Sequence, residues 1–138
     1  MLSKQFIIKN LNDLNELSKF LIFFLKPNVF LLLEGELGVG KTKLTQFIGK
    51  NLKIKEKITS PTFSILQRYK IRENFYLNHF DFFRIKTWEN INFFSDLTFD
   101  NINIIEWPEN NEKFWKNEEI IKVNIIIENK FRLIKILL

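Results

Sequence analysis

The stretch from Gly35 to Thr42 reads Gly-Glu-Leu-Gly-Val-Gly-Lys-Thr and places the strongest constraint on how this chain can fold. Its spacing, G-x-x-x-x-G-K-[ST], is that of a phosphate-binding loop. Such a loop sits between a strand and a helix, and the sequence supplies an apolar run at Val29–Leu33 before it and apolar residues at helical spacing after it. Three of the four glycines in the chain lie in this stretch, which makes a chance turn a poor explanation.

The residue types in this loop match what the binding of a triphosphate requires. Glycines let successive backbone N–H groups approach the phosphates without a Cβ in the way, and the helix N-terminus adds partial positive charge. Lys41 is expected to reach the β- and γ-phosphates, and Thr42 to offer its hydroxyl to a magnesium ion. The predicted binding residues of the loop are Glu36, Leu37, Gly38, Val39, Gly40, Lys41, Thr42 and Lys43.

Length and composition predict a single domain spanning residues 1–138. The chain has no cysteine, which excludes disulfides and thiolate metal sites and suits a reducing compartment. Its longest apolar run, Phe20–Leu25, is far shorter than the roughly 20 residues that cross a bilayer, and no secretory signal is visible. The expected location is the cytoplasm, with no membrane contact.

The formal net charge of +5 raises the question of nucleic-acid binding. Lysine far outnumbers arginine, and asparagine, isoleucine and phenylalanine are abundant, a pattern typical of an A+T-rich genome. Surfaces that read phosphates or bases more often use arginine. The densest basic segment, Lys50 to Lys57, is equally typical of a solvated helix end and loop. Diffuse lysine is therefore the simpler interpretation.

The remaining patterns predict an α/β fold, a P-loop NTPase-like mixed β-sheet flanked by helices on both faces and ending in a C-terminal antiparallel hairpin. Before the loop, the pattern predicts a strand at Ile7–Ile8, a helix over Leu14–Leu25 capped by Asn10 or Asn12, and the loop's own strand. After the loop come its helix, from Lys41 to about Leu52, and strands at Ser64–Lys70 and Phe75–Phe80. The remaining predicted elements are one or two short helices within Thr87–Phe99, a strand at Ile102–Ile105, and a hairpin over Ile121–Leu138.

Two acidic residues come directly after apolar strands. Asp81 follows Phe75–Phe80, and Glu106 follows Ile102–Ile105. Because ligands of such sheets bind beyond the carboxyl ends of the strands, both carboxylates are expected near the nucleotide. Phosphoryl transfer needs a carboxylate that helps to hold magnesium and a group that orients water. We predict Lys41, Asp81 and Glu106 as the catalytic residues; the alternative for each acid is an exposed carboxylate at a strand end.

Three further side chains have both a functional and a structural interpretation. Thr62, after Ser60-Pro61, could sense the γ-phosphate as switch threonines do, or could stabilise a turn. Trp107 could stack on a base, anchor a partner, or be a half-buried loop aromatic. His79 is more typical of a hydrogen-bonded structural residue than of a catalyst.

Four segments together resemble one known family. They are G-E-L-G-V-G-K-T at 35–42, T-S-P-T-F at 59–63, H-F-D-F-F-R at 79–84 and I-E-W-P at 105–108. In content and order they resemble the TsaE (YjeE) family of bacterial ATPases over almost the whole chain. Many protein families share the phosphate loop, whereas few carry the other three segments together.

The resemblance implies an ATPase, weak alone, that works with the TsaB and TsaD proteins to form threonylcarbamoyladenosine at position 37 of tRNAs reading codons that begin with adenine. TsaD would carry out the carbamoyl transfer, and tRNA would be reached indirectly through the complex. ATP and Mg²⁺ are the implied cofactors. By motif matching, Thr42 and Glu106 take the magnesium role, Gly38–Thr42 form the phosphate cradle, and Asp81 is the Walker-B-like acid. The adenine contact falls near Leu11 to Asp13, so Leu11, Thr62 and Trp107 complete the predicted nucleotide contacts.

Two other functions stay open. Small-molecule kinases use the same loop but generally need extra arginines to grip the transferred phosphate, and this chain has only Arg68, Arg72, Arg84 and Arg132. A non-hydrolysing binding module would use ATP only to order the loops around Thr62 and Trp107 for docking.

Overall fold

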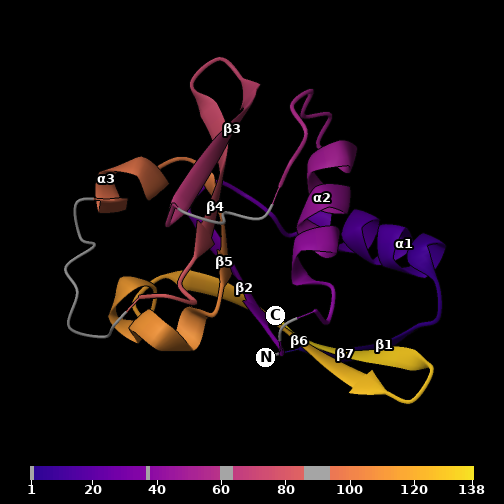
Figure 1. The fold of residues 1–138 in the computed structure, drawn as a ribbon. Helices are drawn as coiled ribbons and strands as arrows, with labels where there is room; N and C mark the ends of the chain where they lie inside the picture. The colour runs from indigo at the N-terminus through magenta and orange to yellow at the C-terminus, as the bar shows by residue number, and fades with distance from the viewer. Residues whose placement is uncertain (1, 37, 60–63, 86–93) are drawn as a thin grey trace.

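A computed structural model describes residues 2–36, 38–59, 64–85 and 94–138 (Figure 1). In chain order the elements are β1 (Ser3–Ile8), α1 (Leu11–Ile22), β2 (Val29–Glu34), α2 (Lys41–Asn51), β3 (Leu66–Arg72), β4 (Phe75–Asp81), α3 (Ser95–Thr98), β5 (Ile102–Glu106), the 3₁₀ helix η2 (Pro108–Phe114), β6 (Glu119–Glu128) and β7 (Phe131–Leu137).

A seven-stranded mixed sheet runs through the molecule in the order β1-β7-β6-β2-β5-β4-β3. The central strand β2 is parallel to β5 and β6, and β4 is parallel to β5. The outer strands pair antiparallel, β3 with β4 at one end and β7 with β6 and β1 at the other. The predicted mixed sheet and the C-terminal antiparallel hairpin are confirmed. The carboxyl ends of β2, β4 and β5 meet at one edge of the sheet.

Different elements cover the two faces of the sheet. Helices α1 and α2 pack on one face, over a core that includes Leu31 and Leu44 (Figure 1). On the opposite face, Phe114 of η2 packs against Phe30 and Phe80 with ring centroids 6.1 and 5.1 Å apart. The sequence did not predict η2, because its residues have no apolar periodicity and aromatic packing on the sheet holds it in place.

Two hydrogen bonds between side chains and backbone amides cap the start of helix α1. The Asp13 amide donates to Asn10 Oδ1 at 2.9 Å, and the Asp13 carboxylate accepts the Lys9 amide at 2.9 Å. The helix ends at Ile22, before the predicted end at Leu25, because the amides of the next three residues bond to carbonyls three residues back and tighten the chain into a 3₁₀-like turn. None of the helices in the described ranges is long and apolar enough to cross a membrane.

Buried asparagines tie β4 and β5 to the turn that precedes β5. Asn78 and Asn103 lie opposite each other in the register, and the Asn78 Nδ2–H donates to Asn103 Oδ1 at 2.9 Å. Asn103 donates in turn to the carbonyls of Thr98 and Asn101, at 3.1 and 3.2 Å. Both Asn78 and Asn103 have 0% of their surface exposed. Burial of these amides is tolerated because each finds polar partners inside the protein.

The network predicts a large effect for a substitution of similar volume. Asn103→Leu would leave one buried Asn78 N–H without its acceptor and would remove one of the two hydrogen bonds that the Thr98 and Asn101 carbonyls each accept, so we expect the free energy of unfolding to fall by about 2–4 kcal/mol. Urea denaturation measures this loss. Asn124→Leu, at a half-buried asparagine on β6, is the control and should change stability by about 0.5 kcal/mol or less. Equal effects of the two substitutions would contradict the importance of the network.

Candidate functional site

The loop between β2 and α2 passes through left-handed backbone at its glycines. Gly35, Gly38 and Gly40 have φ of 150°, 78° and 116°, which L side chains rarely adopt. A Cβ on Gly35 would lie 2.8 Å from the carbonyl oxygen of Ile125, whereas Gly38 and Gly40 have no described neighbour within 4 Å of such an atom. Gly35 therefore lets the loop pack against β6, and the other two leave the backbone open to a ligand.

The first turn of α2 is suited to an anion. Its first amides have no acceptors within the helix, the N-cap Gly40 offers no side-chain acceptor, and the turn contains no acidic residue. Lys41 and Lys43 stand there instead, where their charges oppose the positive end of the helix dipole. Because this arrangement is unfavourable without a counter-charge, the turn favours binding of a phosphate or a similar anion.

The Lys41 ammonium lies inside a cavity next to the loop. Its Nζ donates to the Gly35 carbonyl at 2.5 Å and lies 3.8 Å from the ring centroid of Trp107. Only 5% of the residue is exposed. Burial lowers the pKa of Lys41, and nearby carboxylates, Glu106 first, act in the opposite direction. A desolvated ammonium in this position would interact strongly with phosphate oxygens.

Glu106 and Asp81 lie side by side at the carboxyl ends of β5 and β4, where they are opposite each other in the parallel register. Glu106 Oε2 accepts the Thr42 hydroxyl at 3.2 Å and lies 2.6 Å from His79 Nε2. Asp81 accepts the Phe83 amide at 2.9 Å. Burial raises the pKa of Asp81, and the bond from that amide opposes the shift. The structure thus places both predicted acids beside the predicted loop in one cavity of about 300 Å³, the phosphate cavity.

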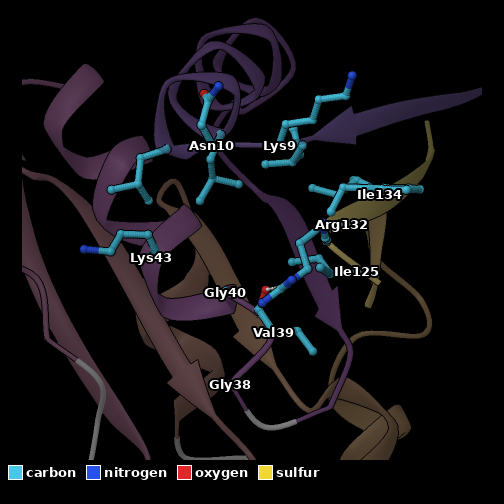
Figure 2. A pocket seen from close by; sticks show the side chains of 14 residues that line it. Lys9, Asn10, Gly38, Val39, Gly40, Lys43, Ile125, Arg132 and Ile134 are labelled. Carbon is cyan, nitrogen blue, oxygen red and sulfur yellow. Dashed lines mark hydrogen bonds between the residues drawn. The ribbon is translucent and has the colours of Figure 1, made fainter. Parts of the chain in front are cut away.

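A second cavity, of about 340 Å³, adjoins the same loop. Leu11 at the start of α1 and Arg132 at the start of β7 line it, together with Gly38, Gly40 and Lys43. Figure 2 shows Arg132 reaching toward Val39, whose carbonyl accepts a bond from Nε at 3.3 Å. The two cavities share Gly38, Gly40 and Lys43, so a ligand with its phosphates in one can extend into the other.

The two described residues predicted to contact the base do not share a cavity. Leu11 lines the second cavity, whereas Trp107 lines the phosphate cavity and packs on Phe83 with ring centroids 4.9 Å apart. Trp107 therefore stands against Lys41, at the phosphate end. Among the loop residues, Glu36 lines neither of these two cavities, and its carbonyl accepts the Val39 amide at 3.3 Å. The predicted contacts Leu37 and Thr62 lie outside the described residues.

Among the side chains at the site that were not predicted, two make hydrogen bonds to predicted site residues, His79 to Glu106 and Arg132 to Val39. His79 was interpreted as structural, yet its described hydrogen bond is to Glu106. The signal was its position two residues before Asp81, since residues two apart on a strand face the same side. Arg132 had only a weak signal, as one of four arginines in a lysine-rich chain. Its place depends on the sheet order that brings β7 next to β1.

The basic segment from Lys50 to Lys57 does not contribute to either cavity. Lys53 and Lys55 line a separate hollow with Lys70 and Arg72 of β3. Lys50, Lys53, Lys55 and Lys57 are exposed at the end of α2 and in the loop after it, so the prediction of a solvated helix end and loop is confirmed.

Comparison with known proteins agrees with this geometry. A sequence model of the family described as "Threonylcarbamoyl adenosine biosynthesis protein TsaE" matches residues 8–134. The chain belongs to the TsaE family. The matched TsaE region contains every described residue of the two cavities that is discussed above. Together with the phosphate loop, membership of the TsaE family indicates a nucleotide-binding protein.

Individual TsaE relatives align over most of the chain. Two proteins described as "tRNA threonylcarbamoyladenosine biosynthesis protein TsaE", from Rickettsia typhi and Rickettsia felis, are 39% and 38% identical to it. The first alignment covers 91% of this chain and 91% of the relative, and the second covers 90% and 74%. The crystal structure of YdiB from Bacillus subtilis matches with a TM-score of 0.78 over 98% of this chain and 84% of that chain, at 23% identity, which shows a common fold.

The loop geometry predicts that alanine lowers the free energy of unfolding by different amounts at two of the glycines. Gly35→Ala would force a Cβ against a backbone carbonyl of β6, so we expect a loss of about 2–4 kcal/mol in the free energy of unfolding. In Gly38→Ala the added Cβ has free space, so we expect a loss of only about 1 kcal/mol, from the left-handed backbone that alanine would have to adopt. Urea denaturation of the nucleotide-free proteins makes the comparison. Similar losses would show that contact with β6 does not restrict the loop at Gly35.

Desolvation of Asp81 predicts a variant that is more stable than the natural protein. Because the folded protein raises the pKa of Asp81 above its ordinary value of 3.8, ionisation of this carboxyl costs stability as pH rises through the raised pKa. Asp81→Asn removes that cost and keeps an acceptor for the Phe83 amide. We expect a higher melting temperature for nucleotide-free Asp81→Asn at pH 7, with the difference disappearing below pH about 3.8, the ordinary pKa. A variant less stable at pH 7 would contradict this.

Proposed function

We propose that this TsaE-family protein binds ATP with Mg²⁺ and hydrolyses the ATP in support of threonylcarbamoyladenosine formation at position 37 of tRNAs that read codons beginning with adenine. The observation that carries the proposal is the 3.2 Å contact between Thr42 Oγ1 and Glu106 Oε2. It joins the start of the helix after the phosphate loop to an acid at a strand end, the pair of oxygen ligands that nucleotide-bound Mg²⁺ requires in proteins with this loop. The names of the relatives support the tRNA pathway.

The residues present fit a magnesium ion that is shared with phosphates. Thr42 and Glu106 would hold it with a hydroxyl and a carboxylate, both oxygen donors of the kind that Mg²⁺ prefers. The described residues contain no group of three or more His, Cys, Asp or Glu side chains that could hold a metal ion alone. This suits Mg²⁺, which usually takes one or two protein ligands beside waters and phosphate oxygens. When bound, the ion would neutralise charge on the β- and γ-phosphate oxygens.

The other residues of the site have separate roles in the proposal. Lys41 would exchange its bond to the Gly35 carbonyl for bonds to phosphate oxygens, and the amides of Gly38–Thr42 would surround the phosphates. Asp81 or Glu106 would orient the attacking water. The adenine would lie toward the second cavity, where Leu11 offers an apolar contact and Arg132 a planar cation.

The proposed partners are the TsaB and TsaD proteins in the cytoplasm, with tRNA reached through their complex. In this arrangement TsaD carries out the carbamoyl transfer, and ATP hydrolysis by the present chain allows repeated turnover. The support is the family membership and the four sequence segments that characterise it.

A small-molecule kinase is the less favoured function. Arg68 and Arg72 stack on Tyr76 and Phe75 of the β3–β4 hairpin, 4.3 and 4.5 Å from the ring centroids. No arginine is among the described residues that line the phosphate cavity, whereas such kinases use arginines to grip the transferred group. A non-hydrolysing binding module would have the same cavity and would differ only in that it does not hydrolyse the bound ATP.

The proposal predicts that Lys41→Ala abolishes repeated tRNA modification. We expect Mg²⁺-dependent ATP hydrolysis in the presence of TsaB and TsaD to fall about 100-fold or more, because a buried, preorganised cation is lost from the developing phosphate charge. Multiple-turnover modification of tRNA should fall in parallel. The matched control is Lys50→Ala, which removes an exposed lysine from the last turn of the same helix and should retain full activity.

Three outcomes would redirect the proposal. Multiple-turnover modification with Lys41→Ala would count against a role for ATP at this site. Transfer of labelled phosphate to a nucleoside or nucleotide would favour the kinase. Tight ATP binding without any turnover in the complete system would favour the non-hydrolysing module.

A further inference from the structure

His79 lies deep in the sheet directly behind the phosphate cavity. Its side chain is 0% exposed, and its Nε2 lies 2.6 Å from Glu106 Oε2. Because β4 alternates its side chains, His79 faces the same side as Asp81 but one step further from the end of the strand. The imidazole therefore contacts a predicted metal ligand from the protein interior, out of reach of solvent.

In a neutral imidazole, the contact determines which ring nitrogen carries the proton. Ionised Glu106 is only an acceptor, so a bare ring nitrogen 2.6 Å from it would bring two lone pairs together. With the proton on Nε2 the contact becomes a short, charge-assisted hydrogen bond. Nδ1 then carries a lone pair, and it is a buried atom with no hydrogen-bond partner among the described residues.

The unpaired Nδ1 argues against a purely structural role. A histidine that serves only the fold would be expected to satisfy both nitrogens, because an unsatisfied buried polar atom costs stability. His79 instead directs its one described hydrogen bond at the carboxylate that also accepts the Thr42 hydroxyl, and through the same oxygen atom. Glu106 Oε2 is thus held from two sides.

We propose that His79 is a positioning residue for magnesium binding. Its Nε2–H holds the Glu106 carboxylate toward Thr42, so that both oxygens are in place before the nucleotide arrives. Without this bond the Glu106 side chain regains rotational freedom, which binding would have to remove. Outer partners of metal ligands typically change metal affinity by about 10–100-fold. The inference rests on the proposed function, since it assigns His79 a role at the same site.

The first test measures which ring nitrogen of His79 carries the proton. His79 is the only histidine in the chain, so in nitrogen NMR of the full-length protein labelled with ¹⁵N-histidine all imidazole signals belong to this residue. We expect the Nε2–H tautomer in the nucleotide-free protein. We also expect its signals to move when a non-hydrolysable ATP analogue is added with Mg²⁺, and to move less when the analogue is added with EDTA. An Nδ1–H tautomer, or the same shift under both conditions, would overturn the proposal.

The second test uses two variants that differ in the donor. His79→Phe keeps a ring of similar size and removes the N–H, whereas His79→Gln retains an amide N–H near the position of Nε2. Calorimetry with the ATP analogue should show about a 10–100-fold loss of affinity for His79→Phe in Mg²⁺, little change in EDTA, and recovery of most of the affinity in His79→Gln. No loss for His79→Phe, or an equal loss with and without Mg²⁺, would overturn the positioning role.

The two tests separate this inference from the proposed function. If the natural protein does not bind the analogue with Mg²⁺, the proposed function fails and the positioning role fails with it, while the tautomer still reports on the His79–Glu106 bond. If the natural protein binds and His79→Phe binds equally well, only the positioning role fails. Should His79→Phe not fold, the comparison of NMR shifts in Mg²⁺ and EDTA decides.

Discussion

The hydrogen bond between Thr42 and Glu106 joins two side chains that are 64 residues apart in the chain, and the rest of the site is arranged around it. It forms because β2 and β5 are parallel neighbours with Leu33 opposite Glu106. The phosphate loop leaves β2 just beyond that point, and its glycines turn the chain so that α2 starts above the end of β5. Any change in the register of these two strands would separate the hydroxyl from the carboxylate.

The groups around this bond are not the most stable choice for the fold alone. Burial lowers the pKa of Lys41 and raises that of Asp81, so each charge is less favourable here than in water. Trp107 adopts φ 58° and ψ 50°, a left-handed conformation that is rare for a bulky side chain. All three residues line the phosphate cavity. Stability comes from elsewhere, from the apolar core under α1 and α2 and from the buried asparagine network, as is usual for a functional site.

Local sequence patterns predicted most of the fold, because most of its elements are specified by residues close together in the chain. The strand before the loop, the loop, the helix after it and the C-terminal hairpin each carry a short-range signal that needs no distant contact. Where packing decided the outcome, the sequence was less informative. Helix α1 ends at Ile22 although apolar spacing continues to Leu25, and η2 is held by contacts of Phe114 with aromatic residues of distant strands. Of the candidate site, Lys41, Thr42, Asp81 and Glu106 were predicted from the motif and from strand ends, and the structure brings them together.

The amino-acid sequence by itself determined the phosphate loop, the strand and helix on either side of it, and the two acids that follow apolar strands, because spacing and residue type act over a few neighbouring residues. Only the tertiary structure decided which side chains meet. The bond of His79 to Glu106, the place of Arg132 beside Val39 and the position of Trp107 against Lys41 depend on strand order and register. Those are settled by burial of apolar surface across the whole sheet, and no local segment encodes them.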